Sequence, residues 1–248
     1  RFIVINKMDR DNANYRKAIA SVEEFSEVRL LPIQLPWGEK QSFKGVIDLI
    51  TMKAYKGEGK TGEDIPDEFR AEAEEGRITL VEAAAEGEDE LLEKYLESGE
   101  LTDEEIYRGL KKVIQAGSFI PVFVAAASSS IGIIPLLDSM VNLMPSPAEV
   151  DPVTADTKNG EEMELEPSDS GPLAAYVWKT TADPFVGRQT YFRVYSGTVS
   201  SDSRVWNQNK EVEERIGTVS IPRGKETISA KVIHTGDIGV VPKLAETV

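Results

Sequence analysis

The chain has 248 residues, of which 43 are acidic and 28 basic, so its formal charge is −15. It contains no cysteine and a single histidine, His234. These counts exclude disulfides, thiolate metal sites and histidine-based metal clusters, and no apolar run approaches the roughly 18 residues of a membrane span. We therefore expect a soluble cytoplasmic protein without a metal site or a membrane partner.

Strands and helices alternate through the first part of the chain. The apolar residues 2–5 (FIVI) are typical of a short strand buried in a parallel sheet. Three-to-four spacing of apolar residues predicts a helix over 14–26, and residues 30–35 predict a second strand that Pro36 ends. Residues 43–57 alternate as in a β-ribbon. This order is typical of an α/β fold.

The acidic excess is confined to one segment. Residues 58–105 contain 19 acidic and 4 basic residues, whereas the remainder holds 24 of each. We expect helix from 67 to 98, and the capping-box pair Thr102 and Glu105 predicts the start of another helix that ends at Gly117. An acidic helical surface serves either solubility or the attraction of a partner with a basic face.

The last part of the chain changes in character. A strand at 120–125 and a helix that reaches Leu143 come first, and residues 144–172 are then rich in proline, serine and acidic residues without periodicity, as in a domain linker. Short alternating strands separated by turn residues follow and predict a small antiparallel β-barrel. The sequence therefore predicts an α/β domain with a helical insert, followed by a barrel domain.

The polar stretch Asn6-Lys7-Met8-Asp9 directly follows the first buried strand, at the edge where open α/β sheets bind ligands. An ionised Asp9 can accept two parallel hydrogen bonds from N1–H and the exocyclic amino group of guanine, a pair of donors that adenine lacks. The stem of Lys7 can lie over the base, and Asn6 can tie the loop to its neighbours. The alternative is an ordinary polar exit from a strand. The spacing and the position favour a guanine site.

A second motif, Gly59-Lys60-Thr61, resembles the end of a phosphate-binding loop. That loop requires a glycine five positions before Gly59, where Ala54 stands, and it joins a buried strand to a helix, which this context does not offer. We expect a hairpin or loop without phosphate contact. The chain then holds a base-reading site without the phosphate-binding half of a nucleotide site, as if it were cut from a GTP-binding protein after that half.

Five segments carry a family resemblance: NKMDR (6–10), PIQLPWGEKQSFKGVIDLI (32–50), LVEAAAEGEDELLEKYLESGELTDEEI (80–106), IPLLDSMVNLMPSP (134–147) and TADPFVGRQTYFRVYSGTV (181–199). In this order and spacing they resemble bacterial elongation factor G. Together they extend over nearly the whole chain, so the resemblance is specific.

The resemblance implies that residues 1–147 are the C-terminal half of a P-loop GTPase domain, with an inserted acidic subdomain at about 37–117. Residues 148–171 are then a linker, and 172–248 the second, β-barrel domain with its last strand truncated. It also implies a ribosome-dependent translational GTPase that binds GTP or GDP with Mg²⁺ and drives translocation. In that family the residues that hold magnesium, the γ-phosphate and the attacking water lie outside this region. We therefore expect the isolated chain to bind no nucleotide tightly and to hydrolyse none.

The family's guanine-specificity motif corresponds to Asn6, Lys7 and Asp9. Its second base-contacting motif, a Ser-Ala pair, falls on Ala126 and Ala127. The backbone N–H of Ala127 can still donate to O6 of guanine, whereas the serine hydroxyl that helps to hold Asp9 is missing at Ala126. The serines of 128–130 offer a substitute that the sequence does not test. Losing one hydrogen bond costs on the order of 1 kcal/mol, so we expect guanine binding to be weakened but not abolished.

The resemblance further implies a monomer whose partners are ribosomal RNA and the stalk protein of the large ribosomal subunit, with the acidic helices at 67–98 contacting the stalk. DNA is not an expected partner. RNA phosphates can also meet four scattered barrel arginines, Arg188, Arg193, Arg204 and Arg215. Residues 214–237 depart from the family's pattern, so a paralogue and a ribosomal protection protein stay open as alternatives. Ala126 and the missing phosphate loop also leave open a non-catalytic docking module with a degenerate G domain.

Overall fold

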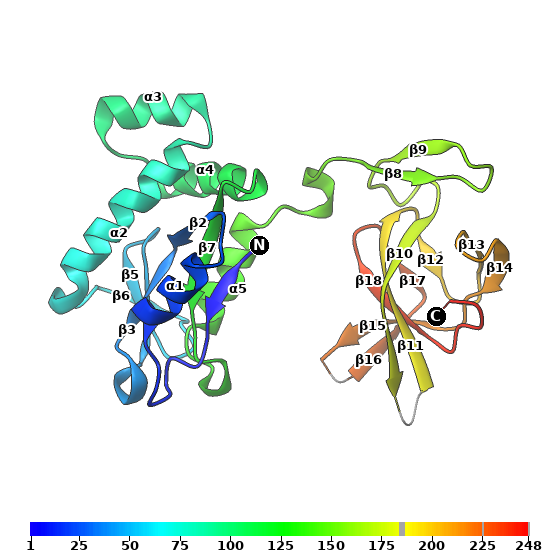
Figure 1. Cartoon of the computed structure of the whole chain (residues 1–248), viewed down its shortest axis with the longest axis horizontal. Coiled ribbons are helices and arrows are strands. Elements are labelled where there is room, and N and C mark those ends of the chain that lie inside the picture. Colours follow the sequence, from blue (N-terminus) through cyan, green and yellow to red (C-terminus); the bar gives the residue numbers. More distant parts are fainter. Residues whose placement is uncertain (184–186, 225, 248) are drawn as a thin grey trace. The chain divides into compact units, whose positions relative to one another are not determined.

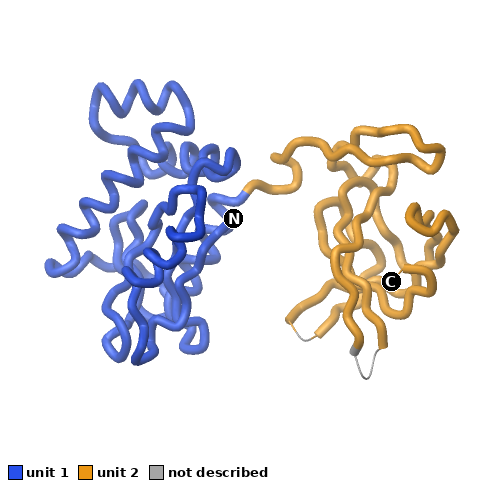
Figure 2. Tube along the Cα trace, in the orientation of Figure 1, with its two compact units in different colours: residues 1–144 blue, residues 145–248 orange. Residues whose placement is uncertain are grey.

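The computed structural model describes residues 1–183, 187–224 and 226–247. The chain divides into two compact units, Arg1–Met144 and Pro145–Val248 (Figure 2), and each has a hydrophobic core of its own. Residues 184–186, within one of the segments that resemble elongation factor G, lie outside the described ranges, as does Val248 at the strand expected to be truncated. Among the described residues, no helix has the length and apolar character needed to cross a membrane.

Three parallel strands run through the first unit (Figure 1), in the order β1-β7-β2. They are β1 (Ile3–Ile5), β7 (Phe119–Val124) and β2 (Arg29–Pro32). The central strand β7 is buried along its whole length, as expected for a continuous apolar run in a parallel sheet. Helix α1 (Tyr15–Glu23) packs against β1 and β2, and helix α5 (Ile133–Leu143) follows β7 in the chain. The predicted α/β fold class is confirmed.

The single strand predicted for residues 30–35 is wrong, because the chain changes sheets at Ile33. Strand β2 ends at Pro32, and the next strand, β3 (Gln34–Trp37), belongs to a separate antiparallel sheet. The backbone of Ile33 joins the two sheets: its N–H donates to the carbonyl of Val122 (3.0 Å), and its own carbonyl accepts from the N–H of Leu49 (3.0 Å).

The antiparallel sheet of the first unit has the order β3-β4-β5-β6. Its other members are β4 (Gly45–Asp48), β5 (Lys53–Lys56) and β6 (Gly62–Glu63). Pro36 lies within β3, opposite Val46, and does not end the strand as the sequence suggests. Because β3 is at the edge of the sheet, the N–H that proline lacks is not needed for pairing with a further strand.

The acidic segment forms two helices where the sequence predicts one, α2 (Asp67–Ala85) and α3 (Asp89–Ser98), followed by α4 (Asp103–Gln115). The break falls at Gly87, where the backbones of α2 and α4 approach closely. A Cβ atom on Gly87 would lie 2.5 Å from the carbonyl oxygen of Gly109, and one on Gly109 would lie 2.1 Å from that of Ala84. Only glycine permits this approach, so the pair fixes where α2 crosses α4.

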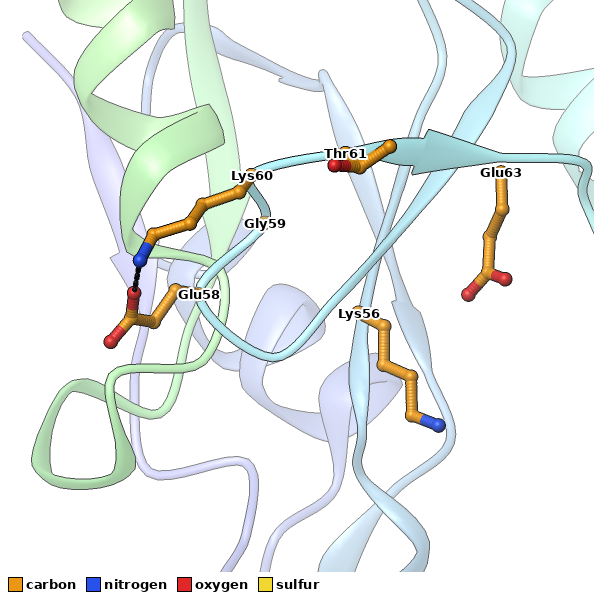
Figure 3. Close-up of a pocket in the computed structure, with 6 residues that line it drawn as sticks. All are labelled: Lys56, Glu58, Gly59, Lys60, Thr61 and Glu63. Atoms are coloured by element: carbon orange, nitrogen blue, oxygen red, sulfur yellow. Dashed lines mark ion pairs between the residues drawn. The ribbon is translucent and has the colours of Figure 1, made fainter.

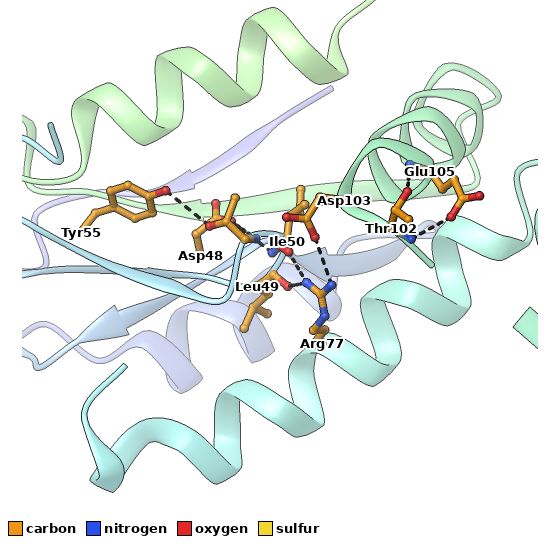
Figure 4. A network of polar contacts seen from close by, with 9 residues as sticks. Asp48, Leu49, Ile50, Tyr55, Arg77, Thr102, Asp103 and Glu105 are labelled. Carbon is orange, nitrogen blue, oxygen red and sulfur yellow. Dashed lines mark hydrogen bonds and ion pairs between the residues drawn. The ribbon is translucent and has the colours of Figure 1, made fainter. Parts of the chain in front are cut away.

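A polar network holds the inserted helices on the antiparallel sheet (Figure 4). The guanidinium of Arg77, on α2, donates to the carbonyl oxygens of Leu49 and Ile50 and to the carboxylate of Asp103 on α4 (3.2 Å). The predicted capping box at the start of α4 is confirmed, since Thr102 N–H donates to Glu105 Oε2 (2.8 Å) and Glu105 N–H donates to Thr102 Oγ1 (3.3 Å).

The second unit is antiparallel β-structure, as predicted. Its main sheet has the order β10-β11-β18-β15-β16, and β12 pairs with β17 and β13 with β14. Along β11 the buried and half-buried residues alternate, as expected for a sheet with one face on a core. The strands are β10 (Ala174–Asp183), β11 (Gly187–Ser196), β12 (Val199–Ser200), β13 (Arg204–Asn207), β14 (Val212–Arg215), β15 (Val219–Arg223), β16 (Glu226–Ala230), β17 (Val232–Ile233) and β18 (Ile238–Pro242).

The segment 148–171, expected to be a linker, contains a hairpin of β8 (Val153–Asp156) and β9 (Glu162–Leu165). Its last residues are fastened to the second unit. Asp169 accepts a hydrogen bond from the N–H of Thr235 (2.9 Å) and lies 2.7 Å from Nδ1 of His234. These contacts lower the pKa of Asp169 below its usual value, with the backbone hydrogen bond from Thr235 as the largest cause. His234 therefore has a structural partner.

Candidate functional site

The loop that follows β1 is anchored by Met8. Its side chain is buried in the core of the first unit, its N–H donates to the carbonyl of Ala125 (3.3 Å), and its carbonyl accepts from the N–H of Lys40 (2.8 Å). Lys7 adopts a left-handed backbone conformation with φ of 62°. Met8 thus points inward, and the side chains of Asn6 and Lys7 are exposed.

The loop that follows β7 leaves the sheet beside the first one. β1 and β7 are adjacent parallel strands, and the N–H of Ala125 donates to the carbonyl of Ile5 (3.0 Å). Ala126 pairs with Ile131 through two backbone hydrogen bonds (3.0 and 3.1 Å), so the residues between them form a short closed loop. Both loops therefore emerge at the carboxyl edge of the sheet, where α/β folds place their ligands.

Asn6 ties the two loops together, as expected from the sequence. Its Oδ1 accepts hydrogen bonds from the backbone N–H of Lys7 (2.7 Å) and of Ala127 (3.0 Å). The Ala127 N–H, which the family resemblance assigns to the base, is thus engaged by Asn6 here. Base and asparagine would share this donor.

The carboxylate of Asp9 is held by Ser129, three positions after Ala126, where the family resemblance places a serine. Ser129 Oγ donates to Asp9 Oδ2 (2.6 Å), whereas Ala126 is buried and has no donor in its side chain. Arg10 Nε lies 3.9 Å from Asp9 Oδ1 and is mostly exposed. With 24% of the Asp9 side chain exposed, the carboxylate remains open to a ligand. The sequence left 128–130 as possible substitutes, and the structure selects Ser129.

This arrangement can accept a planar pair of donors. An ionised carboxylate has about four lone-pair sites, of which Ser129 uses one. The remaining sites of Asp9 fit two parallel N–H groups at the spacing found in guanine, while adenine presents an acceptor and a C–H there. Within the described part of the chain, no group of three or more histidine, aspartate or glutamate side chains could hold a metal ion. The arrangement thus offers an exposed carboxylate whose orientation is held by Ser129.

The Gly59-Lys60-Thr61 stretch lies in the connection between β5 and β6, as predicted, and lines a pocket with Lys56, Glu58 and Glu63 (Figure 3). The ammonium of Lys60 lies 2.8 Å from the carboxylate of Glu58. The carbonyls of Gly57 and Glu58 accept from N–H groups at the start of α5 (2.8 and 3.0 Å). The connection therefore caps helix α5, and Lys60 forms an ion pair with Glu58.

The four barrel arginines considered for RNA contact are engaged within the second unit. Two form ion pairs, one donates to a carbonyl oxygen and one lies against a tyrosine ring. The contacts are Arg204–Glu213 (2.8 Å), Arg215–Asp202 (3.1 Å), Arg188 with Leu244 O, and Arg193 with the ring of Tyr195 (5.7 Å to its centre). Each of the four arginines therefore has a partner within the second unit.

Both units of the chain are similar to known proteins. Residues 172–248 match the family model described as elongation factor G domain 2. Elongation factor G from Fervidobacterium nodosum is 37% identical over 247 residues, which cover 97% of this chain and 36% of that protein. A crystal structure of a Thermus thermophilus protein aligns with a TM-score of 0.76 and 29% identity over 99% of this chain and 34% of that one. The chain thus spans about a third of the length of these relatives. It is a homologue of elongation factor G, with an α/β part followed by domain 2 of that family.

Proposed function

We propose that this chain carries the guanine-reading part of the nucleotide site in a ribosome-dependent translational GTPase of the elongation factor G type. One observation carries the proposal. Two hydrogen bonds, Ala127 N–H to Asn6 Oδ1 and Ser129 Oγ to Asp9 Oδ2, join the two loops at the carboxyl ends of adjacent parallel strands, and we call these four residues the Asp9 cluster. The homology with elongation factor G supports the same function independently.

Base selectivity in this proposal rests on Asp9. Its carboxylate accepts the N1–H and amino donors of guanine, and a site built for that pair rejects adenine because the carboxylate then faces an acceptor. The exposed Lys7 stem lies over the base, while O6 meets the Ala127 N–H that Asn6 orients. GTP or GDP with Mg²⁺ is the proposed nucleotide. The residues described here contribute to recognition of the base, and we assign no step of hydrolysis to them.

The proposal places the protein in the cytoplasm as a monomer that works with ribosomes. The acidic helices α2 and α3 are its proposed contact with the stalk protein of the large subunit. Their surface combines carboxylates with exposed apolar side chains, since Ile78 is 57% and Leu96 75% exposed. Such a mixture suits a partner that offers both basic and apolar groups.

The same surface favours a second candidate function, that of a docking module without nucleotide chemistry. The two functions differ in what the Asp9 cluster does. In a docking module, changes at Asp9 leave all ribosome-linked behaviour unaltered, and changes on α2 or α3 abolish it. In the GTPase, both sets of changes matter.

The proposal is tested by nucleotide competition on the full-length protein. Ribose-labelled fluorescent GDP is bound first, and unlabelled GDP, xanthosine diphosphate and ADP are titrated against it. We expect GDP to displace the probe at the lowest concentration and ADP to fail at concentrations at least about 100-fold higher, since two charge-assisted hydrogen bonds separate the bases. Equal displacement by GDP and ADP, or no binding of the probe, would overturn the proposal.

A further inference from the structure

We propose that Ser129 is the positioning residue for Asp9, so that the hydroxyl that orients the guanine-reading carboxylate comes from position 129 in this protein. This inference rests on the proposed function and deepens it. The carrying contact is the hydrogen bond from Ser129 Oγ to Asp9 Oδ2, at 2.6 Å. That length is within the range of hydroxyl–carboxylate bonds, which are among the stronger neutral-to-charged ones.

Position 126 has no means of doing this. The methyl group of Ala126 offers no donor, and only 1% of the residue is exposed. Its backbone is also fully committed, because its N–H and carbonyl both pair with Ile131 and its carbonyl accepts in addition from the N–H of Ser129 (3.0 Å). A donor for Asp9 must come from elsewhere in the loop.

The loop geometry brings position 129 to Asp9. Residues Ala127–Ser129 form one turn of 3₁₀-helix, and Ser130 then adopts a left-handed conformation with φ of 56°. The N–H of Ser130 donates to the carbonyl of Ala127 (3.1 Å), which closes the turn. Because the loop curls back on itself before Ile131, the side chain of Ser129 faces the loop that follows β1.

The contact orders Asp9 without blocking it. Ser129 occupies one lone pair of Oδ2 and fixes the rotation of the carboxylate, so part of the ordering that guanine requires is present before binding. The charged side chain of Arg10 is also near, with its Nε 3.9 Å from Asp9 Oδ1. Because 62% of the Arg10 side chain is exposed, this ion pair holds the carboxylate only weakly. Ser129 is therefore the group that sets the direction of Asp9.

The test compares side chains of equal shape at position 129 in the full-length protein. Ser129→Thr keeps the hydroxyl and Ser129→Val replaces it with a methyl group, while Ser128→Ala, one position earlier, is the matched control. We expect Ser129→Val to lower GDP affinity by roughly fivefold relative to Ser129→Thr, as for loss of one hydrogen bond, and Ser128→Ala to leave it unchanged. Xanthosine diphosphate, measured in an Asp9→Asn background, reports whether the effect passes through residue 9.

In that background the hydroxyl of Ser129 meets a neutral amide in place of the carboxylate, and this weaker hydrogen bond means that Ser129→Val should change xanthosine diphosphate affinity by less than about twofold. Equal GDP affinity of the Val and Thr variants would overturn the role of Ser129 while leaving guanine selectivity of the wild type intact. If Ser129→Val lowers nucleotide affinity equally in the wild-type and the Asp9→Asn backgrounds, Ser129 supports the loop structure and does not act through residue 9. That result would also overturn the inference. If the wild type fails to prefer GDP over ADP, the proposed function falls, and this inference with it.

Discussion

Asn6 and Ala127 are 121 positions apart in the chain, yet Oδ1 of Asn6 accepts a 3.0 Å hydrogen bond from the backbone N–H of Ala127. The same oxygen accepts from the N–H of Lys7 at 2.7 Å. One side chain therefore fixes both loops of the candidate site. Its position is set by the pairing of β1 with β7, whose ends both loops continue.

Asn6→Ala is expected to weaken guanine binding about tenfold and to cost about 1 kcal/mol of stability, because two backbone donors lose their acceptor. Asn14→Ala is the matched control. Asn14 is also an asparagine whose Oδ1 accepts a backbone N–H, that of Lys17 (2.8 Å) at the start of α1. Asn14→Ala should lower the free energy of unfolding by a similar amount without changing nucleotide affinity. Urea unfolding and GDP titration measure the two effects, and equal GDP affinity of both variants would contradict the role of Asn6.

Lys60→Met should leave nucleotide affinity unchanged. The ammonium of Lys60 is paired with Glu58 at 2.8 Å, and its loop caps α5 in place of cradling a phosphate (Figure 3). If Lys60 bound phosphate, the same change would remove a charge-assisted hydrogen bond, and nucleotide affinity would fall roughly 10- to 100-fold. A fall of more than about threefold in GDP or GTP affinity would show that this connection does contact phosphate.

Arg77→Met is expected to destabilise the first unit by about 2–3 kcal/mol, because it removes hydrogen bonds from a charged group to two backbone carbonyls and to Asp103 (Figure 4). Methionine keeps most of the apolar stem. Arg70→Met is the control, since its ion pair with Asp67 is exposed and should be worth less than about 1 kcal/mol. Hydrogen exchange of backbone amides in peptides from α2 and α4 would measure the local loss of stability. Equal protection in the two variants would contradict this account of the network.

The pKa of Glu105 gives a pH-dependent stability. Hydrogen bonds from Lys94 (2.7 and 2.8 Å), and then from Thr102, hold the pKa of Glu105 at about 2, below its usual 4.5. The folded state therefore binds fewer protons than the unfolded state, so this stabilisation is complete above pH 4.5 and disappears as the pH falls towards 2.

Glu105→Gln should accordingly flatten the stability profile of the first unit between pH 4.5 and 2 and leave its slope at neutral pH unaltered. Glu104→Gln, one position earlier on α4, serves as the control and should retain the wild-type profile. Denaturant midpoints measured across this range would distinguish them. Identical slopes for the wild type and Glu105→Gln would contradict the prediction.

Much of the site was predictable because it depends on local order along the chain. An apolar run followed by Asn6-Lys7-Met8-Asp9 places polar groups at the end of a buried strand, and a second apolar run ending at Ala125 does the same. In a parallel sheet both ends lie on one edge. The capping box at the start of α4 was predictable for the same reason, since its partners are three positions apart.

The features that the sequence did not reveal depend on tertiary geometry. The change of sheet at Ile33 follows from its pairing with Val122 and Leu49, both distant in the chain. The break at Gly87 follows from the close approach of α2 and α4, which no periodicity signals. The choice of Ser129 among three serines depends on the left-handed turn at Ser130, a conformation that serine adopts only when its surroundings impose it.

If Asp9 recognises guanine, Asp9→Asn in the full-length protein should change which base is preferred. Asparagine can donate a hydrogen bond where guanine carries its amino group and xanthine a carbonyl. We predict that the affinity of the variant for GDP falls by about 100-fold and that the variant binds xanthosine diphosphate more tightly than GDP. Ribosome-stimulated hydrolysis should shift from GTP to xanthosine triphosphate. A variant that keeps the wild-type preference for GDP would contradict the account, because the cluster around Asp9 would then be a polar loop contact without a role in base recognition.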